Sequence, residues 1–182
     1  MRKHLLRVFA LAGLALVQAG AQVSACDIAL PRGLKPDASE SIPGWMVYRF
    51  TSAAPVAGHM LYSRVKQPKL PDRRAAGQLI NARVRSTAAA LFNRRVSAQK
   101  LELLEVKTFA PGPNGQSATG YAFVVILAFG TTSVRASGYL RGNVKAGDLS
   151  LAFSVTHPDE VHKALPIVEQ FAAQPGHECN AG

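Results

Sequence analysis

The second half of the chain alternates between hydrophobic and polar residues with a period of two, which is typical of half-buried β-strands. The alternation is clearest at Asp148–Thr156, where every second residue is leucine, phenylalanine or valine. Residues 101–109, 121–129 and 133–141 also have a strand-like composition. Segment 121–129 is hydrophobic on both faces, so we expect it to lie inside the sheet. Together the four segments predict an antiparallel meander.

In two other segments the hydrophobic residues recur every three or four positions, which predicts two amphipathic helices. The first begins at Pro71 and Asp72, where the Asp72 carboxylate can cap the first turn, and it runs to about Asn93. Its buried stripe consists of Ala76, Ile80, Val84, Thr87, Ala88 and Leu91. The second begins at Pro158, and Pro166 is expected to kink or restart it. Its buried stripe consists of Val161, Leu165, Val168 and Phe171 or Ala172.

Two further strands, at residues 45–50 and 59–66, precede the first helix and predict a hairpin with a loose turn. Clusters of proline and glycine predict loops at residues 27–44 and 110–120. An antiparallel sheet packed against its helices buries all of these hydrophobic stripes. We therefore predict an α+β fold. Its antiparallel sheet consists of the hairpin and the four-strand meander, packed by one long helix and a C-terminal helix.

This order of elements resembles the PsbP-like fold of small bacterial envelope lipoproteins of the DcrB type. In that fold a terminal helix packs beside a meander such as the one predicted at residues 121–156. The resemblance covers residues 45–173 and concerns topology alone, without signature residues. It implies a fold and assigns no site residue, because one fold can carry unrelated functions.

The first 25 residues have the features of a bacterial export signal. Three basic residues precede a hydrophobic run at 8–17, and small residues follow it. The run is too short for a lasting membrane anchor, which needs about 20 hydrophobic residues. We predict a periplasmic or secreted protein organised as a signal peptide at 1–25, an extended lead-in segment at 26–44, one α+β domain at 45–175 and a C-terminal tail at 176–182.

The chain has two cysteines, Cys26 and Cys179, near the two ends of the predicted mature protein. Two thiols in an oxidising compartment usually pair, and a bridge here would join two segments that otherwise fray. Alternatively, residues 23–26 resemble a lipobox, the motif at which bacterial lipoproteins are cleaved. Cys26 would then be acylated and would hold the protein at the inner or outer membrane. The sequence leaves both alternatives open, and a membrane location follows only from the second.

Basic residues are concentrated in one part of the chain. The predicted signal holds three of the 21 basic residues and none of the 11 acidic ones, so the mature net charge is +7. Residues 64–100 contain ten basic residues, opposed only by Asp72. The ten are Arg64, Lys66, Lys69, Arg73, Arg74, Arg83, Arg85, Arg94, Arg95 and Lys100. Most of them belong to the outer sides of the first predicted helix and to the segments beside it.

Five of these residues, Arg74, Arg83, Arg85, Arg94 and Arg95, form a candidate binding face. Such a face could bind an acidic partner protein, anionic lipid head groups or a polyanionic envelope polymer. A solvated helix face without a specific partner is the alternative. Nucleic acid is not expected as a partner, because the protein is predicted to be exported and the segment has almost no aromatic residues for base stacking.

Candidate catalytic residues are few. His157, Asp159 and His162 lie in the densest cluster of potential metal ligands. However, histidines five residues apart do not project from one face of a helix, so the usual zinc-binding spacing is missing. Asp159 and Glu160 are explained more simply as first-turn residues near the positive end of the helix dipole. Without a serine elbow, a phosphate loop or a dinucleotide fingerprint, the sequence predicts no enzyme and no cofactor.

Aromatic residues on the predicted strands could line a small-molecule cleft between the sheet and the helices. These residues are Trp45, Tyr48, Phe50, Tyr62, Tyr121, Phe123 and Tyr139. Core packing explains most of them equally well.

The sequence favours an exported, non-enzymatic envelope protein that binds a partner protein or an anionic ligand through its arginine-rich helix face. An acylated lipoprotein with a structural or assembly role is one alternative, since its basic face would lie against anionic head groups beside its own anchor. A metal-dependent hydrolase that uses His157, Asp159 and His162 is the other.

Overall fold

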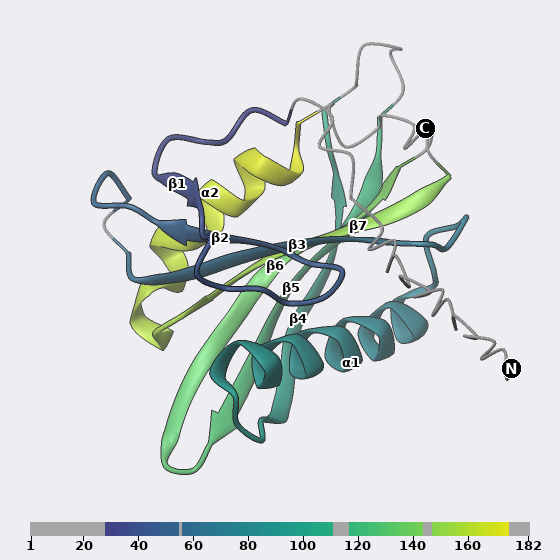
Figure 1. Ribbon diagram of the computed structural model, residues 1–182. Helices are drawn as coiled ribbons and strands as arrows, with labels where there is room; N and C mark the ends of the chain where they lie inside the picture. The colour runs from purple at the N-terminus through teal and green to yellow at the C-terminus, as the bar shows by residue number, and fades with distance from the viewer. Residues whose placement is uncertain (1–27, 55, 111–116, 144–146, 175–182) are drawn as a thin grey trace, which may run out of the picture.

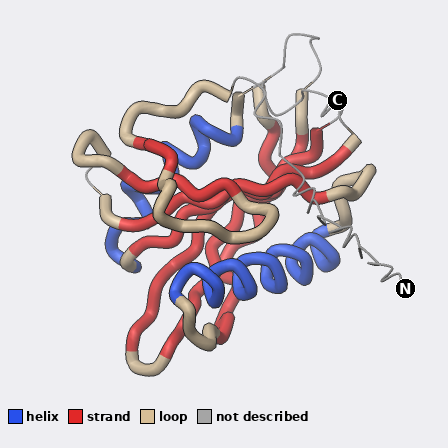
Figure 2. Tube along the Cα trace, viewed as in Figure 1, coloured by secondary structure: helices blue, strands red, loops and turns tan. Residues whose placement is uncertain are grey.

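Seven antiparallel strands and two α-helices make up the described part of this computed structural model, which comprises residues 28–54, 56–110, 117–143 and 147–174. The strands form one sheet in the order β1-β2-β3-β7-β6-β5-β4. Figure 2 shows the strands of this sheet in red and the helices in blue. In chain order the elements are β1 (Leu34–Pro36), β2 (Met46–Phe50), β3 (Gly58–Val65), α1 (Arg73–Phe92), β4 (Ser97–Thr108), β5 (Thr119–Phe129), β6 (Thr132–Asn143), β7 (Asp148–Thr156), the 3₁₀ turn η1 (Pro158–Glu160) and α2 (Val161–Ala172).

The sheet lies between the two helices, with α1 on one face and α2 on the other (Figure 1). Side chains alternate between the two faces of a strand, so the strands contribute to two hydrophobic cores. On β3, for example, Leu61 packs into the core under α1, whereas Met60 and Tyr62 pack into the core under α2. Ile80 closes the first core from α1, and Val168 closes the second from α2.

The α+β fold predicted from the sequence is confirmed. Strands β4 to β7 form the antiparallel meander, and β2 pairs with β3 as the hairpin. Strand β3 pairs with β7 over its whole length, which joins the hairpin and the meander into one sheet. This pairing connects segments that are separated in the chain by α1 and by most of the meander.

Helix α1 begins and ends where its local sequence predicts. The Asp72 carboxylate accepts a hydrogen bond of 2.8 Å from the Ala75 amide and thereby caps the first turn. After the last turn, Asn93 has a φ of 48°, in the left-handed region that asparagine adopts more easily than most residues. Both signals act within a few residues of the helix end, which is why sequence alone located them.

Three details differ from the sequence prediction. The segment 27–44, expected as a loop, contains edge strand β1, because three of its residues pair with β2. Strand β4 begins at Ser97, four residues before the expected start, because two register shifts interrupt its period of two. Helix α2 begins at Val161, after η1, and continues through Pro166 without restarting. Pro166 is exposed, so the carbonyl that its missing N–H leaves unpaired can face water.

Candidate functional site

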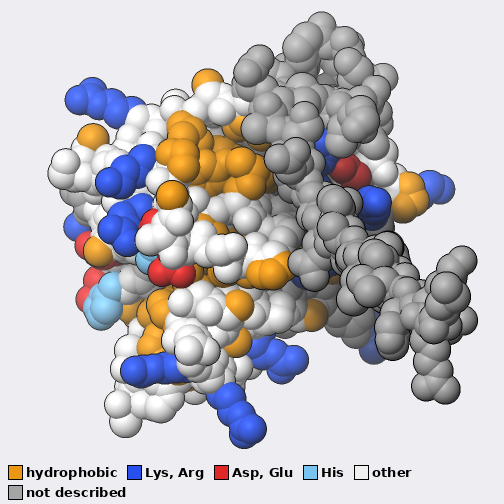
Figure 3. Space-filling model, in the orientation of Figure 1, with side chains coloured by type: hydrophobic (Ala, Val, Ile, Leu, Met, Phe, Trp, Pro, Cys, Tyr) orange, Lys and Arg blue, Asp and Glu red, His pale blue; other side chains and the backbone are white. Residues whose placement is uncertain are grey.

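The five arginines of the predicted binding face are all exposed. Arg74, Arg83 and Arg85 belong to α1, and Arg94 and Arg95 lie in the turn between α1 and β4. Within the described residues, none of their side chains has an ion-pair or hydrogen-bond partner. Figure 3 shows lysine and arginine side chains projecting around α1, while acidic side chains on the visible face gather elsewhere. These guanidinium groups are therefore accessible to an external anion.

The structure divides these arginines into groups. An α-helix turns by about 100° per residue, so Arg74 and Arg85, eleven residues apart, lie within about 20° of each other. Arg83 lies about 160° around the helix axis from Arg85. Arg74 and Arg85 both line the space between α1 and β4, so they share the flank of the helix that faces β4. Arg83 lies on the opposite flank.

Two adjoining hollows lie between α1 and β4, and together we name them the α1–β4 groove. The hollow near the start of α1 has a volume of about 360 Å³, and the hollow farther along the helix has a volume of about 350 Å³. Gln78 and Asn81 line both hollows, which makes the groove continuous. The remaining lining residues are Arg73, Arg74, Gly77, Ala82 and Arg85 on α1, and Ala98, Leu101, Glu102 and Leu104 on β4.

Small residues and a bent strand leave this groove open. Gly77 presents no side chain to β4, and a Cβ there would lie 3.2 Å from Leu101 Cδ2, which is tighter than ordinary contact. Ala82 and Ala98 leave space in the second hollow. The register of β4 with β5 shifts twice along this stretch, and such bulges bend an edge strand.

The groove carries more positive than negative charge. Three guanidinium groups, those of Arg73, Arg74 and Arg85, line it together with one carboxylate, that of Glu102. A guanidinium group can hold a carboxylate through two parallel N–H···O bonds. Asn81 lines the groove, and its side-chain oxygen is buried without a hydrogen-bond partner among the described residues. The charge of the groove therefore suits a ligand that brings carboxylates.

Gln78 and Asn81 belong to the site, although the sequence analysis did not select them. With Arg74 and Arg85 they occupy positions i, i+4, i+7 and i+11, which form one polar stripe along a flank of α1. That spacing is visible in the sequence beside the hydrophobic stripe. Glu102 had no comparable signal, because only the tertiary structure brings β4 next to α1.

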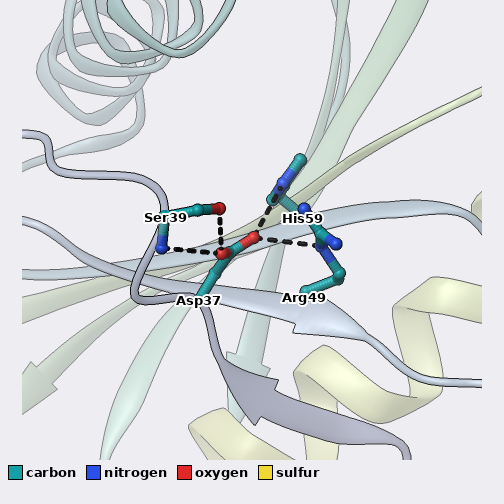
Figure 4. Close-up of polar contacts among 4 residues, drawn as sticks. All are labelled: Asp37, Ser39, Arg49 and His59. Atoms are coloured by element: carbon teal, nitrogen blue, oxygen red, sulfur yellow. Dashed lines mark hydrogen bonds and ion pairs between the residues drawn. The ribbon is translucent and has the colours of Figure 1, made fainter.

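A second polar cluster joins the end of β1 to the hairpin of β2 and β3 (Figure 4). The Asp37 carboxylate accepts hydrogen bonds from the Ser39 hydroxyl at 2.5 Å and from Arg49 Nε at 3.1 Å. His59 Nε2 lies 3.3 Å from the carboxylate oxygen that Arg49 contacts. The Ser39 hydroxyl donates to the carboxylate and not to the imidazole, so it is not arranged as an activated nucleophile. The cluster acts as a polar clamp between β1 and the hairpin.

Acid should loosen this clamp. The hydrogen bond from the Ser39 hydroxyl, with smaller contributions from the Ser39 amide, Arg49 and His59, lowers the pKa of Asp37 below its ordinary value of 3.8. A lowered folded-state pKa stabilises the fold above the unfolded-state pKa, and this stability is lost as the pH falls through the folded-state value. We expect wild-type protein to lose stability below about pH 4 more steeply than the Asp37→Asn variant. Urea unfolding followed by Trp45 fluorescence at a series of pH values measures this difference, and equal slopes would contradict it.

The candidate hydrolase residues lie at the start of α2. The His157 ring accepts a hydrogen bond of 3.4 Å from the Asp159 amide and caps η1, whereas His162 is exposed on α2. The Glu160 carboxylate accepts a hydrogen bond of 3.1 Å from the Ala57 amide, which ties η1 to the segment before β3. Among the described residues, no group of three or more histidine, cysteine, aspartate or glutamate side chains could hold a metal ion.

The sheet separates the aromatic residues that the sequence analysis considered for one cleft. The core under α2 contains Tyr48, Phe50, Tyr62 and Tyr139, and the core under α1 contains Trp45, Tyr121 and Phe123. Burial raises the pKa of Tyr48 to about 12, and the Tyr139 hydroxyl donates a hydrogen bond of 2.9 Å to Glu169. Residues on opposite faces of a sheet cannot line one cleft, so these side chains serve the two cores.

Cys26 and Cys179 lie outside the described residues, as do the predicted signal peptide at 1–25 and the tail at 176–182. The disulfide bond and the acylation of Cys26 therefore stay predictions. Within the described ranges, no helix is both long enough and hydrophobic enough to cross a membrane.

Comparison of the chain with protein-family models and with curated proteins gave no match.

Proposed function

We propose that this chain is an exported, non-enzymatic envelope protein that binds an acidic partner protein through the α1–β4 groove. One observation carries the proposal: Arg74 and Arg85 lie on the same flank of α1, line the groove, and have no ion-pair partner among the described residues. The export signal at residues 1–25 supports the location.

Binding in this groove depends on electrostatic attraction between arginine and carboxylate groups. The guanidinium groups are exposed, so water hydrates them in the free protein. A partner carboxylate replaces this water when it binds. Exposed charges attract an acidic partner before contact and accelerate its association. Salt screens such attraction over about 10 Å at 0.1 M ionic strength, so the affinity should fall as salt is added.

The predicted resemblance to PsbP-like envelope proteins concerns topology alone. It assigns no role to the groove residues, because one fold can carry many unrelated functions.

Arg85 and Arg83 provide a matched test of the proposal. They are two residues apart on α1, both are exposed, and only Arg85 lines the groove. We expect Arg85→Glu to weaken the binding of a fluorescein-labelled glutamate-rich peptide by about tenfold, because one charged hydrogen-bonded contact is replaced by a repulsion. Arg83→Glu makes the same change in net charge and should weaken binding by less than about threefold.

Fluorescence anisotropy at low and high salt measures these affinities. Equal losses in the two variants would show that only the net charge matters and would overturn the groove as the site. An affinity that does not change between about 0.05 M and 0.5 M salt would overturn the electrostatic mechanism.

A further inference from the structure

We propose that the partner's acidic segment is an extended chain that pairs, as an added strand, with the free edge of β4. This inference rests on the proposed function and specifies its ligand: a peptide segment with a short strand-forming part followed by spaced carboxylates. Three features of β4 and one of α1 support it.

Strand β4 is the last strand of the sheet. It is twelve residues long and pairs with β5 on one side, while on its other side no strand of the described residues pairs with it. The edge strand at the opposite end, β1, has only three residues. An edge strand exposes backbone N–H and C=O groups that a further strand can pair with. By length, β4 is the edge that can hold an added strand.

The two halves of β4 differ in how open they are to an added strand. Both register shifts occur before Leu104, and the bulges that they mark protect an edge against pairing. Residues 103–108 pair with β5 in continuous register, so their backbone is regular. This half contains no proline. Its one lysine, Lys107, forms an ion pair of 2.5 Å with Glu169 of α2, whereas its other charged residue, Glu105, is exposed. Lysine is the usual edge-protecting residue, and here its charge is held against another element.

Val106 gives residues 103–108 an exposed hydrophobic contact surface. Its side chain is 68 % exposed, the highest exposure among the large hydrophobic residues that the structure describes. It pairs in register with Tyr121, whose side chain lies in the core under α1, so Val106 lies on the α1 face beyond the helix start. A hydrophobic side chain of an added strand can cover Val106.

The distance between Arg74 and Arg85 determines the spacing that we expect between the carboxylates of the partner segment. Arg74 and Arg85 are eleven residues apart, which is about 16 Å along a helix axis. An extended chain covers this distance in about five residues. A segment that runs antiparallel to β4 pairs first with residues 103–108 and then continues along the groove from Arg74 to Arg85. We therefore expect a strand-forming part of about six residues, followed by two acidic residues about four or six positions apart, an even spacing that places both carboxylates on the same side of the extended chain.

The test uses a peptide of about twelve residues in which alternating threonine and valine precede two glutamates about four positions apart. A second peptide has the same sequence, with N-methyl groups on alternate amides of the threonine and valine part. N-methylation removes backbone donors and leaves the charge unchanged. We expect it to weaken binding to the full mature chain by at least about tenfold, as the loss of several backbone hydrogen bonds predicts.

Hydrogen exchange provides the second measurement. On binding, amides within residues 103–108 should gain protection, while those of β1 should not change. Binding that depends on Arg85 but is insensitive to N-methylation would overturn strand addition and leave the proposed function intact. No binding of either peptide, together with binding to anionic lipid vesicles, would overturn both. Dimerisation of the chain through β4, detected by light scattering, would overturn an acidic partner as the occupant of this edge.

Discussion

Replacing Gly138 by alanine is expected to lower the free energy of unfolding by at least about 3 kcal/mol, because the new methyl group has no space. Gly138 lies in the middle of β6, and its Cβ would overlap the carbonyl oxygen of Ala152 and lie 2.5 Å from Cα of Phe153. These are backbone atoms of the neighbouring strand β7, so a change of side-chain rotamer cannot relieve the clash.

The position between two phenylalanines explains why glycine is needed there. Gly138 is in register with Phe123 on β5 and with Phe153 on β7. The two rings lie on the α1 side of the sheet with their centroids 6.4 Å apart, and both residues are fully buried. Phe153 also makes an edge-on contact of 5.4 Å with Trp45. A side chain at residue 138 would enter this aromatic cluster and disturb the core that supports α1 and its groove.

Gly142→Ala is the matched control, since Gly142 belongs to the same strand. The nearest atoms to a Cβ there are Thr119 O at 3.3 Å and Leu70 Cβ at 3.8 Å, so a small adjustment suffices. We expect this variant to lose less than about 1 kcal/mol. Chemical unfolding followed by tryptophan fluorescence compares the two, and a Gly138→Ala variant as stable as Gly142→Ala would contradict the packing argument.

Replacing Arg141 by methionine is expected to cost about 3 kcal/mol of stability, although the two side chains have similar length. Arg141 is only 1 % exposed. Its Nη1 donates hydrogen bonds of 2.9 Å to the Ala172 carbonyl and 2.8 Å to the Gln174 carbonyl, and its guanidinium lies 5.4 Å from the centre of the Phe109 ring. The last carbonyls of a helix lack partners within the helix, so Arg141 satisfies groups that would otherwise be buried unpaired.

The location of Arg141 determines which part of the fold should open first in this variant. Its positive charge lies at the negative end of the α2 dipole, so its removal should loosen the last turn of α2 before the rest of the fold. Hydrogen exchange should show faster opening of α2 amides in Arg141→Met, with a smaller change in α1. Arg135→Met, on the same strand at a half-exposed position, is the control and should lose less than about 1 kcal/mol. Equal stability of the two variants would contradict a capping role.

Gly138→Ala and Arg141→Met also separate effects on stability from effects on binding. The core under α1 supports the groove, whereas Arg141 contributes to the opposite face of the sheet. At a temperature where Arg141→Met is still folded, its affinity for the acidic peptide should equal that of the wild-type chain. A loss of affinity in that variant would indicate that α2, and not the α1–β4 groove, carries the binding surface.

The sequence predicted those features that depend on neighbouring residues. Asp72 and Asn93 act within one turn of the ends of α1, and the buried stripe of α1 follows from a spacing of three and four. The strands of the meander were predicted because their partners follow one another in the chain. The polar stripe of α1 also follows from the sequence, because the pitch of a helix places residues at this spacing on one flank. The stripe consists of Arg74, Gln78, Asn81 and Arg85.

Only the tertiary structure decided the features that depend on contacts between distant segments. Strand β1 has three residues and no strong strand pattern, and it exists because β2 and the clamp at Asp37 hold it. The start of β4 was missed because the bulges break the alternation from which a strand is recognised. The groove itself forms because the pairing of β3 with β7 closes one sheet that leaves β4 at its edge beside α1. Local propensity cannot encode such a pairing, since its free energy comes from burying residues about 90 positions apart in a common core.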